Sequence, residues 1–135
     1  MTPPKSATLI DFPTSISWFD EEGILCSVPK KDAPALNMED AREYVDLFRK
    51  QVEDKKVCIV ALATGSPEIP KRERDWIAEE ISKFTAAMAV IFTSPMSRMV
   101  AQVFFAFKPP TYPVKFFSNE QDAKAWIRQF LPEKK

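Results

Sequence analysis

Lys56–Leu62 reads KVCIVAL, a short and mostly apolar run that is rich in β-branched residues. Such a run is typical of a strand that is buried on both faces of a sheet. Ala87–Phe92 (AMAVIF) repeats the pattern, and Val114–Phe117 (VKFF) is a third short strand. Helical patterns lie between and after these strands. Because strands alternate with helices, the sequence predicts right-handed crossovers and a mostly parallel sheet.

About four helices are expected. They cover 37–52, 70–86, Ser94–Phe107 and a final stretch that follows Ser118. Asn37 is a good N-cap residue, and Ser118 with Gln121 resembles a capping box. Apolar residues at helical spacing predict the inner faces of three of these helices: Ala41, Tyr44, Val45 and Phe48; Ile77, Ile81 and Phe84; Ala123, Trp126, Ile127 and Phe130.

The N-terminal part of the chain predicts an antiparallel edge for this sheet. Ser15–Phe19 and Ile24–Val28 are two apolar runs separated by the residues DEEG, where Gly23 can take a left-handed turn conformation. Residues 1–14 contain three prolines and form an arm in which Ala7–Phe12 is a candidate edge strand. We therefore expect an α/β fold with one domain at 15–131, an arm at 1–14 and a tail at 132–135.

The composition narrows the range of partners. The chain has 135 residues, is 45% hydrophobic, and balances 19 basic against 19 acidic residues. With no net charge, it has no electrostatic drive toward nucleic acid or an anionic membrane. No apolar run is long enough to span a bilayer, and the first residues do not resemble a signal peptide. We expect a cytoplasmic protein without an integral membrane segment.

Several catalytic chemistries lack their residues here. The sequence has no histidine, so it offers no histidine base, Ser-His pair or histidine metal ligand. Its two glycines, Gly23 and Gly65, are too few for a Walker loop or a dinucleotide-binding loop. Cys26 and Cys58 lie in predicted strands and are interpreted as buried free thiols. We therefore expect no enzyme activity, no metal and no cofactor.

The order of elements resembles the SpoIIAA-like, or STAS, fold, in the subgroup of small bacterial proteins described as STAS/CRAL-TRIO-like. The resemblance covers about Ser15–Leu131. Four stretches of sequence carry it: KVCIVALATG, KRERDWIAEE, AAMAVIFTSPMSRMVAQVFF and KPPTYPVKFFSNEQDAKAWI. In the last of these, a proline-containing loop leads to a short aromatic strand, an acidic cap and an Ala-x-x-Trp helix. The resemblance implies an interaction or regulatory module rather than a catalyst.

Two family behaviours follow from that resemblance. In anti-sigma-factor antagonists, a Ser or Thr after the central strand is phosphorylated and controls partner binding; the matching residues here are Thr64, Gly65 and Ser66, without the family's Asp-Ser-Ser-Gly pattern. CRAL-TRIO domains hold a lipid in an apolar pocket. The alternative function is therefore a binder of a small apolar ligand or lipid, with Met96, Met99, Val103 and Phe104 as the candidate lining.

Ser94–Phe107 (SPMSRMVAQVFFAF) is apolar on more sides than a surface helix needs. We expect one arc to pack on the sheet: Met96, Met99, Val100 and Val103. Phe105 lies opposite that arc, with Phe104 and Ala101 beside it. Burial of a phenylalanine side chain stabilises by roughly 1.5–3 kcal/mol, so an exposed one favours association. These three residues are the predicted homodimer contact; a protein partner or a small apolar ligand is the alternative.

A third candidate site contains basic residues. Lys71, Arg72 and Arg74 occupy the first turn of the predicted 70–86 helix, where positive charge opposes the helix dipole. With Thr64–Ser66 just before them, they would suit an anion. The alternative is that they form ordinary ion pairs. The DEEG carboxylates are expected to be a solvated hairpin turn.

Overall fold

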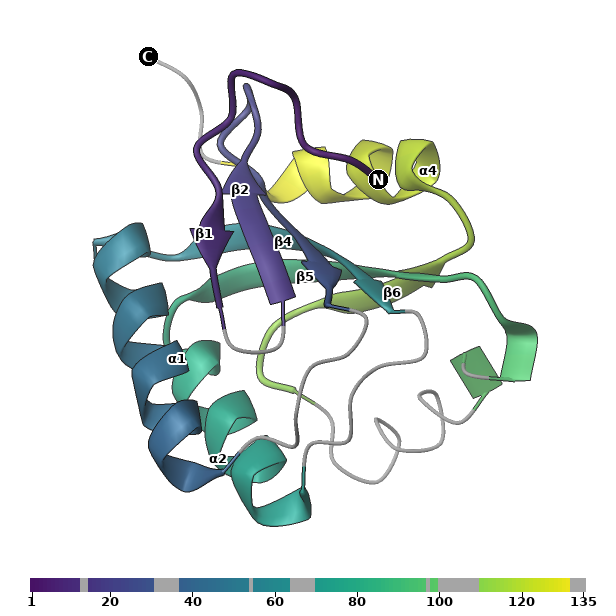
Figure 1. Ribbon diagram of the computed structural model, residues 1–135. Coiled ribbons are helices and arrows are strands. Elements are labelled where there is room, and N and C mark those ends of the chain that lie inside the picture. Colours follow the sequence, from purple (N-terminus) through teal and green to yellow (C-terminus); the bar gives the residue numbers. More distant parts are fainter. Residues whose placement is uncertain are drawn as a thin grey trace.

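The computed structural model describes residues 1–12, 15–30, 37–53, 55–63, 70–96, 98–99 and 110–131. Its centre is a six-stranded sheet whose spatial order follows the chain order, β1-β2-β3-β4-β5-β6 (Figure 1). The strands are β1 (Ile10–Asp11), β2 (Ser15–Phe19), β3 (Leu25–Pro29), β4 (Val57–Ala63), β5 (Thr85–Phe92) and β6 (Val114–Phe117). The predicted edge strand in Ala7–Phe12 is thus present as β1.

The sheet is mixed, as predicted. β1 pairs antiparallel with β2, and β2 pairs antiparallel with β3. From β3 onward each neighbouring pair is parallel. The turn between β2 and β3 contains Gly23 at φ 82°, the left-handed conformation expected of that glycine.

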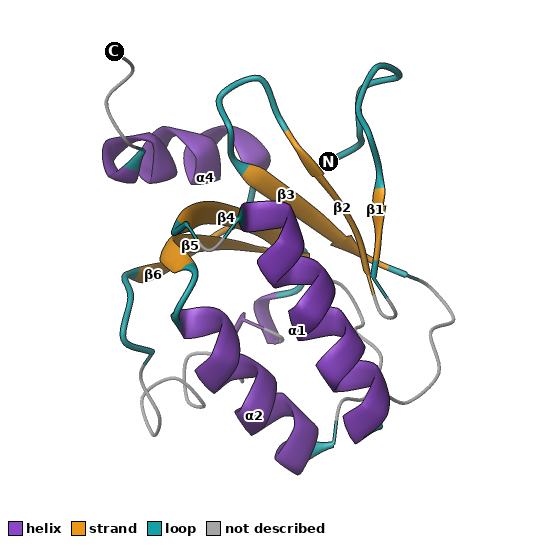
Figure 2. Cartoon of the chain, turned by 90° about the vertical axis from the view of Figure 1, so that its left-hand side faces the viewer, coloured by secondary structure: helices purple, strands orange, loops and turns teal. Residues whose placement is uncertain are grey.

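Among the described residues, three α-helices cover the two faces of the sheet: α1 (Met38–Val52), α2 (Lys71–Ser82) and α4 (Glu120–Ile127), which continues as the 3₁₀ turn η1 (Arg128–Phe130). α1 and α2 lie on one face and α4 on the other (Figure 2). Because each parallel strand is added on the same side of the previous one, right-handed crossovers place α1 and α2 on a common face.

The expected number of about four helices is not met among the described residues. The fourth predicted helix, Ser94–Phe107, lies mostly outside the described residues: Pro95, Met96, Arg98 and Met99 are helical, and residues 97 and 100–107 are not described. No helix in the described part is both long and apolar enough to span a bilayer.

Two boundaries differ from the prediction. The second helix ends at Ser82 rather than near Ala86, and β5 begins at Thr85. Pairing with β4 explains this, because the Val57 N–H donates to the Phe84 carbonyl at 2.9 Å and Val57 lies opposite Thr85. The final helix is capped by Asn119 rather than Ser118, since the Asn119 side chain accepts a 2.8 Å hydrogen bond from the Asp122 N–H.

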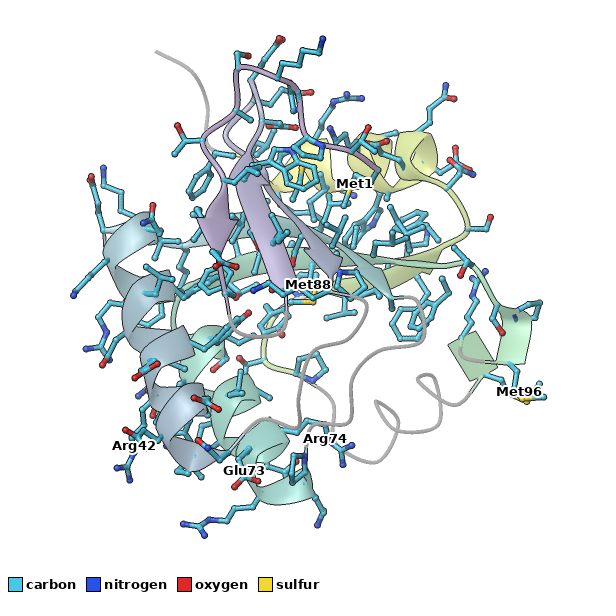
Figure 3. The ribbon with its side chains drawn as sticks, viewed as in Figure 1. Met1, Arg42, Glu73, Arg74, Met88 and Met96 are labelled. Atoms are coloured by element: carbon cyan, nitrogen blue, oxygen red, sulfur yellow. The ribbon has the colours of Figure 1, made fainter. Side chains whose placement is uncertain are left out.

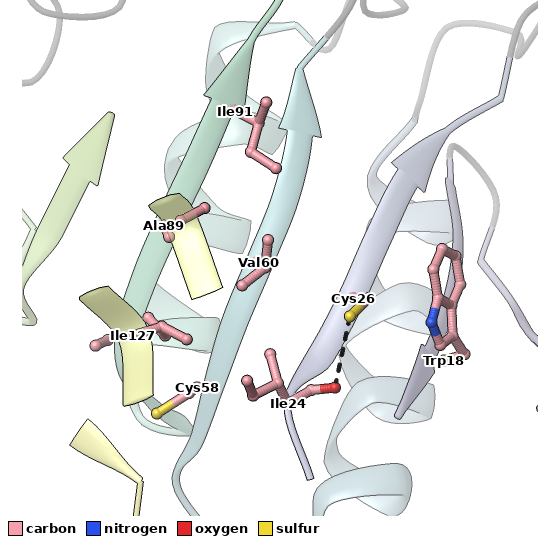
Figure 4. Close-up of a cluster of buried hydrophobic side chains, with 10 residues drawn as sticks. Trp18, Ile24, Cys26, Cys58, Val60, Ala89, Ile91 and Ile127 are labelled. Carbon is pink, nitrogen blue, oxygen red and sulfur yellow. Dashed lines mark hydrogen bonds between the residues drawn. The ribbon is translucent and has the colours of Figure 1, made fainter. Parts of the chain in front are cut away.

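The sheet separates two apolar cores. On the α4 face, Trp18, Cys26, Val60 and Ala89 belong to a buried cluster that includes Ile127 of α4 (Figure 4). On the other face, a second cluster is buried against α1 and the end of α2: Ile10, Phe12, Leu25, Phe48, Val52, Ile59 and Phe84. Alternate residues of β4 enter the two clusters, so the prediction that KVCIVAL is buried on both faces is confirmed.

Candidate interaction surface

The chain leaves β5 through a helical turn that presents two exposed methionines. The Arg98 N–H donates to the Ser94 carbonyl at 3.2 Å, which closes the turn. The Arg98 Nη2 donates to the Phe116 carbonyl at 3.4 Å, so the turn is also fastened to β6. Met96 is 75% exposed and Met99 is 64% exposed. Figure 3 shows Met96 projecting from the molecule on the side away from α1 and α2.

This exposure corrects the expectation for the inner arc. Met96 and Met99 do not pack on the sheet, because the turn meets β6 through Arg98 and holds both thioethers toward solvent. An exposed methionine side chain lacks the roughly 1.5–3 kcal/mol of stabilisation that its burial would give. Two such side chains on one turn form an apolar surface, and surfaces of this kind favour association. The other predicted residues of this region, Val100, Ala101, Val103, Phe104 and Phe105, lie outside the described residues.

For the candidate anion site, the structure describes the residues on α2 but not those of the preceding loop. Lys71, Arg72 and Arg74 are exposed in the first turn of α2, and Pro70 provides no side-chain cap. Lys71 Nζ lies 4.0 Å from Asp75 Oδ2, an i,i+4 ion pair. Thr64, Gly65 and Ser66 lie outside the described residues, so the loop half of this site stays a prediction.

Sequence reasoning missed how the β2–β3 turn contacts α4. Asp20 Oδ1 accepts hydrogen bonds from the N–H groups of Glu22 and Ile24, both at 2.9 Å. Its Oδ2 lies 3.2 Å from Lys124 Nζ, and Arg128 Nε lies 2.9 Å from Glu22 Oε2. The expectation of a solvated turn is wrong for Asp20 and Glu22. The available signal was the i,i+4 spacing of Lys124 and Arg128 on the last helical stretch.

The ionisation of these groups follows from the contacts. The hydrogen bond from Arg128 lowers the pKa of Glu22, and the same bond raises the pKa of Arg128. Burial alone would lower the pKa of Lys124, but its bonds to Asp20 and Glu120 outweigh burial and raise it. These shifts keep Glu22, Lys124 and Arg128 charged near neutral pH.

The two cysteines are buried free thiols, as predicted. Burial raises the pKa of Cys26 to about 11 and also raises the pKa of Cys58. A thiol is nucleophilic as its thiolate, so both are inert at neutral pH. Within the described residues no group of three or more His, Cys, Asp or Glu side chains is placed to hold a metal ion.

A mixed sheet with α1 and α2 on one face and α4 on the other defines a small α/β protein of the SpoIIAA-like class. The chain is similar to a solved structure described as an uncharacterized protein from the DUF3478 family with a SpoIIAA-like fold, from Shewanella loihica PV-4. The match covers 94% of this chain and 98% of that chain, with 14% identity and a TM-score of 0.55, and it shows the fold alone. The predicted resemblance to the SpoIIAA-like, or STAS, fold is confirmed.

The chain belongs to the family described as Domain of unknown function (DUF7793), whose model matches residues 17–131. Comparison with curated proteins gave no match.

Proposed function

We propose that this protein is a non-enzymatic STAS-like interaction module that acts in the cytoplasm and pairs with a second copy of itself. The proposed contact residues are Ala101, Phe104 and Phe105, as the sequence predicts, and the exposed Met96 and Met99 precede them in the same segment. The observation that supports it is the exposure of two methionines at i and i+3 on one turn, at 75% and 64%. Thioether side chains adapt to the shape of an apolar partner.

The edges of the sheet are poor alternatives for association. β1 has two residues. β6 has four, follows Pro113 and carries the exposed Lys115. Short strands, prolines and lysines are the features that prevent edge-to-edge pairing. Association is therefore expected through the turn after β5 and not by extension of the sheet.

The exposure of the methionines also favours a contact surface over the alternative of an apolar ligand site. A ligand site is concave and removes most of the ligand from water. Met96 and Met99 instead project into solvent, at 75% and 64% exposed.

The test is light scattering on the full chain at micromolar concentration. The double variant Met96→Glu/Met99→Glu and the variant Phe105→Glu are each compared with wild type. Leu9→Glu is the matched control, because Leu9 is also an exposed large apolar residue, at 52%, but lies in the N-terminal arm. We expect the first two variants to be monomeric and the control to remain dimeric. A dimer that persists in both surface variants would contradict the assigned surface.

A further inference from the structure

A hollow of about 360 Å³ lies between the N-terminal arm, the end of β2 and the C-terminal end of α1. Ile10 and Phe19 supply apolar lining. Ser6, Thr8, Glu21 and Gln51 supply polar lining. Apolar walls with a few convergent polar groups are the usual composition of a small-molecule site, and the volume lies at the lower end of the usual range of about 300–1,000 Å³.

The polar side chains of this hollow are not used by the fold. Within the described part of the chain, the side chains of Ser6, Thr8, Glu21 and Gln51 form no hydrogen bond or ion pair. Asp20 also lines the hollow, but its carboxylate accepts hydrogen bonds from two backbone N–H groups and forms an ion pair with Lys124. All four residues are exposed, so their side chains, which come from three parts of the chain, are open to solvent and can form hydrogen bonds to another molecule.

The charge of the lining defines the chemistry of that molecule. Among its described lining residues the hollow contains two carboxylates, Asp20 and Glu21, and no lysine or arginine. Lys124 compensates Asp20, which leaves Glu21 as the uncompensated charge of that described lining. Carboxylate, hydroxyl and amide oxygens all accept hydrogen bonds, and an aromatic ring such as Phe19 attracts a cation over its face. We propose that this hollow binds a small organic cation with a flat apolar body, of the ammonium or amidinium class.

The arm that forms one wall is held in place by the sheet. β1 pairs with β2, and the Phe12 N–H donates to the Ser15 carbonyl at 2.9 Å. Ala7, which also lines the hollow, packs against the cluster on the α4 face. The arm residues of the lining precede the span 17–131 that matches the family model, whereas Phe19, Asp20, Glu21 and Gln51 lie within it, so the hollow lies between the arm and the family domain.

The experiment is an NMR titration of the full chain with benzamidinium, with the neutral and nearly isosteric benzamide as the matched probe. We expect saturable shifts of the backbone amides of Ile10, Phe19 and Gln51, and about tenfold or greater weakening with benzamide, since a charged hydrogen bond is lost. Glu21→Gln should weaken benzamidinium binding by a similar factor. Glu39→Gln, an exposed carboxylate at the start of α1, is the control and should leave it unchanged.

Three results would overturn the proposal. The first is the lack of saturable shifts at these amides with benzamidinium. The second is equal affinity for benzamide, which would mean that the cation is not recognised. The third is unchanged affinity in Glu21→Gln. Glu21 is exposed and its side chain forms no hydrogen bond or ion pair with the described residues, so this variant is expected to fold as wild type does.

Discussion

Arg128 binds Glu22 through two nitrogens, although 106 positions separate the two residues in the chain. Arg128 Nε donates to both carboxylate oxygens, at 2.9 and 3.1 Å, and Nη2 donates to Oε1 at 3.0 Å. One turn earlier on α4, Lys124 contacts Asp20. These two pairs join the β2–β3 turn to the last helix, and α4 in turn covers the core that contains Cys26.

Asp20 is the organising residue of this contact. Asp20→Ala removes the acceptor of two backbone N–H groups and the partner of Lys124, so we expect a loss of about 2 kcal/mol in the free energy of unfolding. Asp20→Asn keeps an oxygen for the turn and should lose less. Urea unfolding of the two variants measures the difference. Equal losses would show that the turn hydrogen bonds contribute little.

The pair Glu22–Arg128 predicts a specific pH dependence. The pKa of Glu22 is lowered from 4.5 in the folded state, so its stabilising effect is present above that value and is lost as pH falls through the lowered pKa. Wild type should therefore be more stable than Glu22→Gln at pH 7, and the gap should close in acid. Chemical denaturation across this range gives both curves. A gap that stays constant or widens in acid would have the wrong sign.

The burial of the two cysteine thiols predicts how fast they react with a thiol reagent. Because burial raises the pKa of Cys26 to about 11, native protein should react very slowly with a thiol reagent at pH 8. Both thiols should react rapidly once the protein is unfolded in urea. Rapid labelling of Cys26 in the native state would mean that the α4 face opens more readily than the packing implies.

Glu53 ends α1 in a left-handed conformation, at φ 54°. Glycine takes this conformation without the Cβ penalty, so Glu53→Gly should stabilise the protein by about 0.5–1 kcal/mol. Glu53→Ala keeps the penalty and serves as the control; it should give no gain. Thermal unfolding monitored by circular dichroism compares the three proteins, and a destabilised Glu53→Gly would contradict this account of the helix end.

Local sequence patterns predicted most of the fold. The span 15–19 was predicted and found as β2, and 114–117 as β6, because short apolar runs between turn residues identify strands well. Asn37 was predicted as the cap of α1, and its side chain accepts from the Asp40 N–H at 2.8 Å. The start of β5 was not predicted, because the helical spacing of Ile81 and Phe84 continues into a segment that pairing with β4 converts to strand.

Long-range contacts explain what the sequence could not predict in the candidate sites. The exposure of Met96 and Met99 depends on which side of their turn meets β6, and the Arg98 contact with Phe116 sets this. The hollow beside Glu21 also depends on a long-range contact, because it forms where the N-terminal arm lies beside the turn between β2 and β3. Helical periodicity shows which face of a helix is apolar, but it does not show which element of the fold packs against that face.

The claim that this module pairs with a second copy is tested most directly by the molar mass of the wild-type chain in solution. Sedimentation equilibrium over a series of concentrations reports that mass without assumptions about shape. We predict that the mass rises from 15.4 kDa toward twice that value within the micromolar range. A mass that stays at 15.4 kDa at every concentration would contradict self-association.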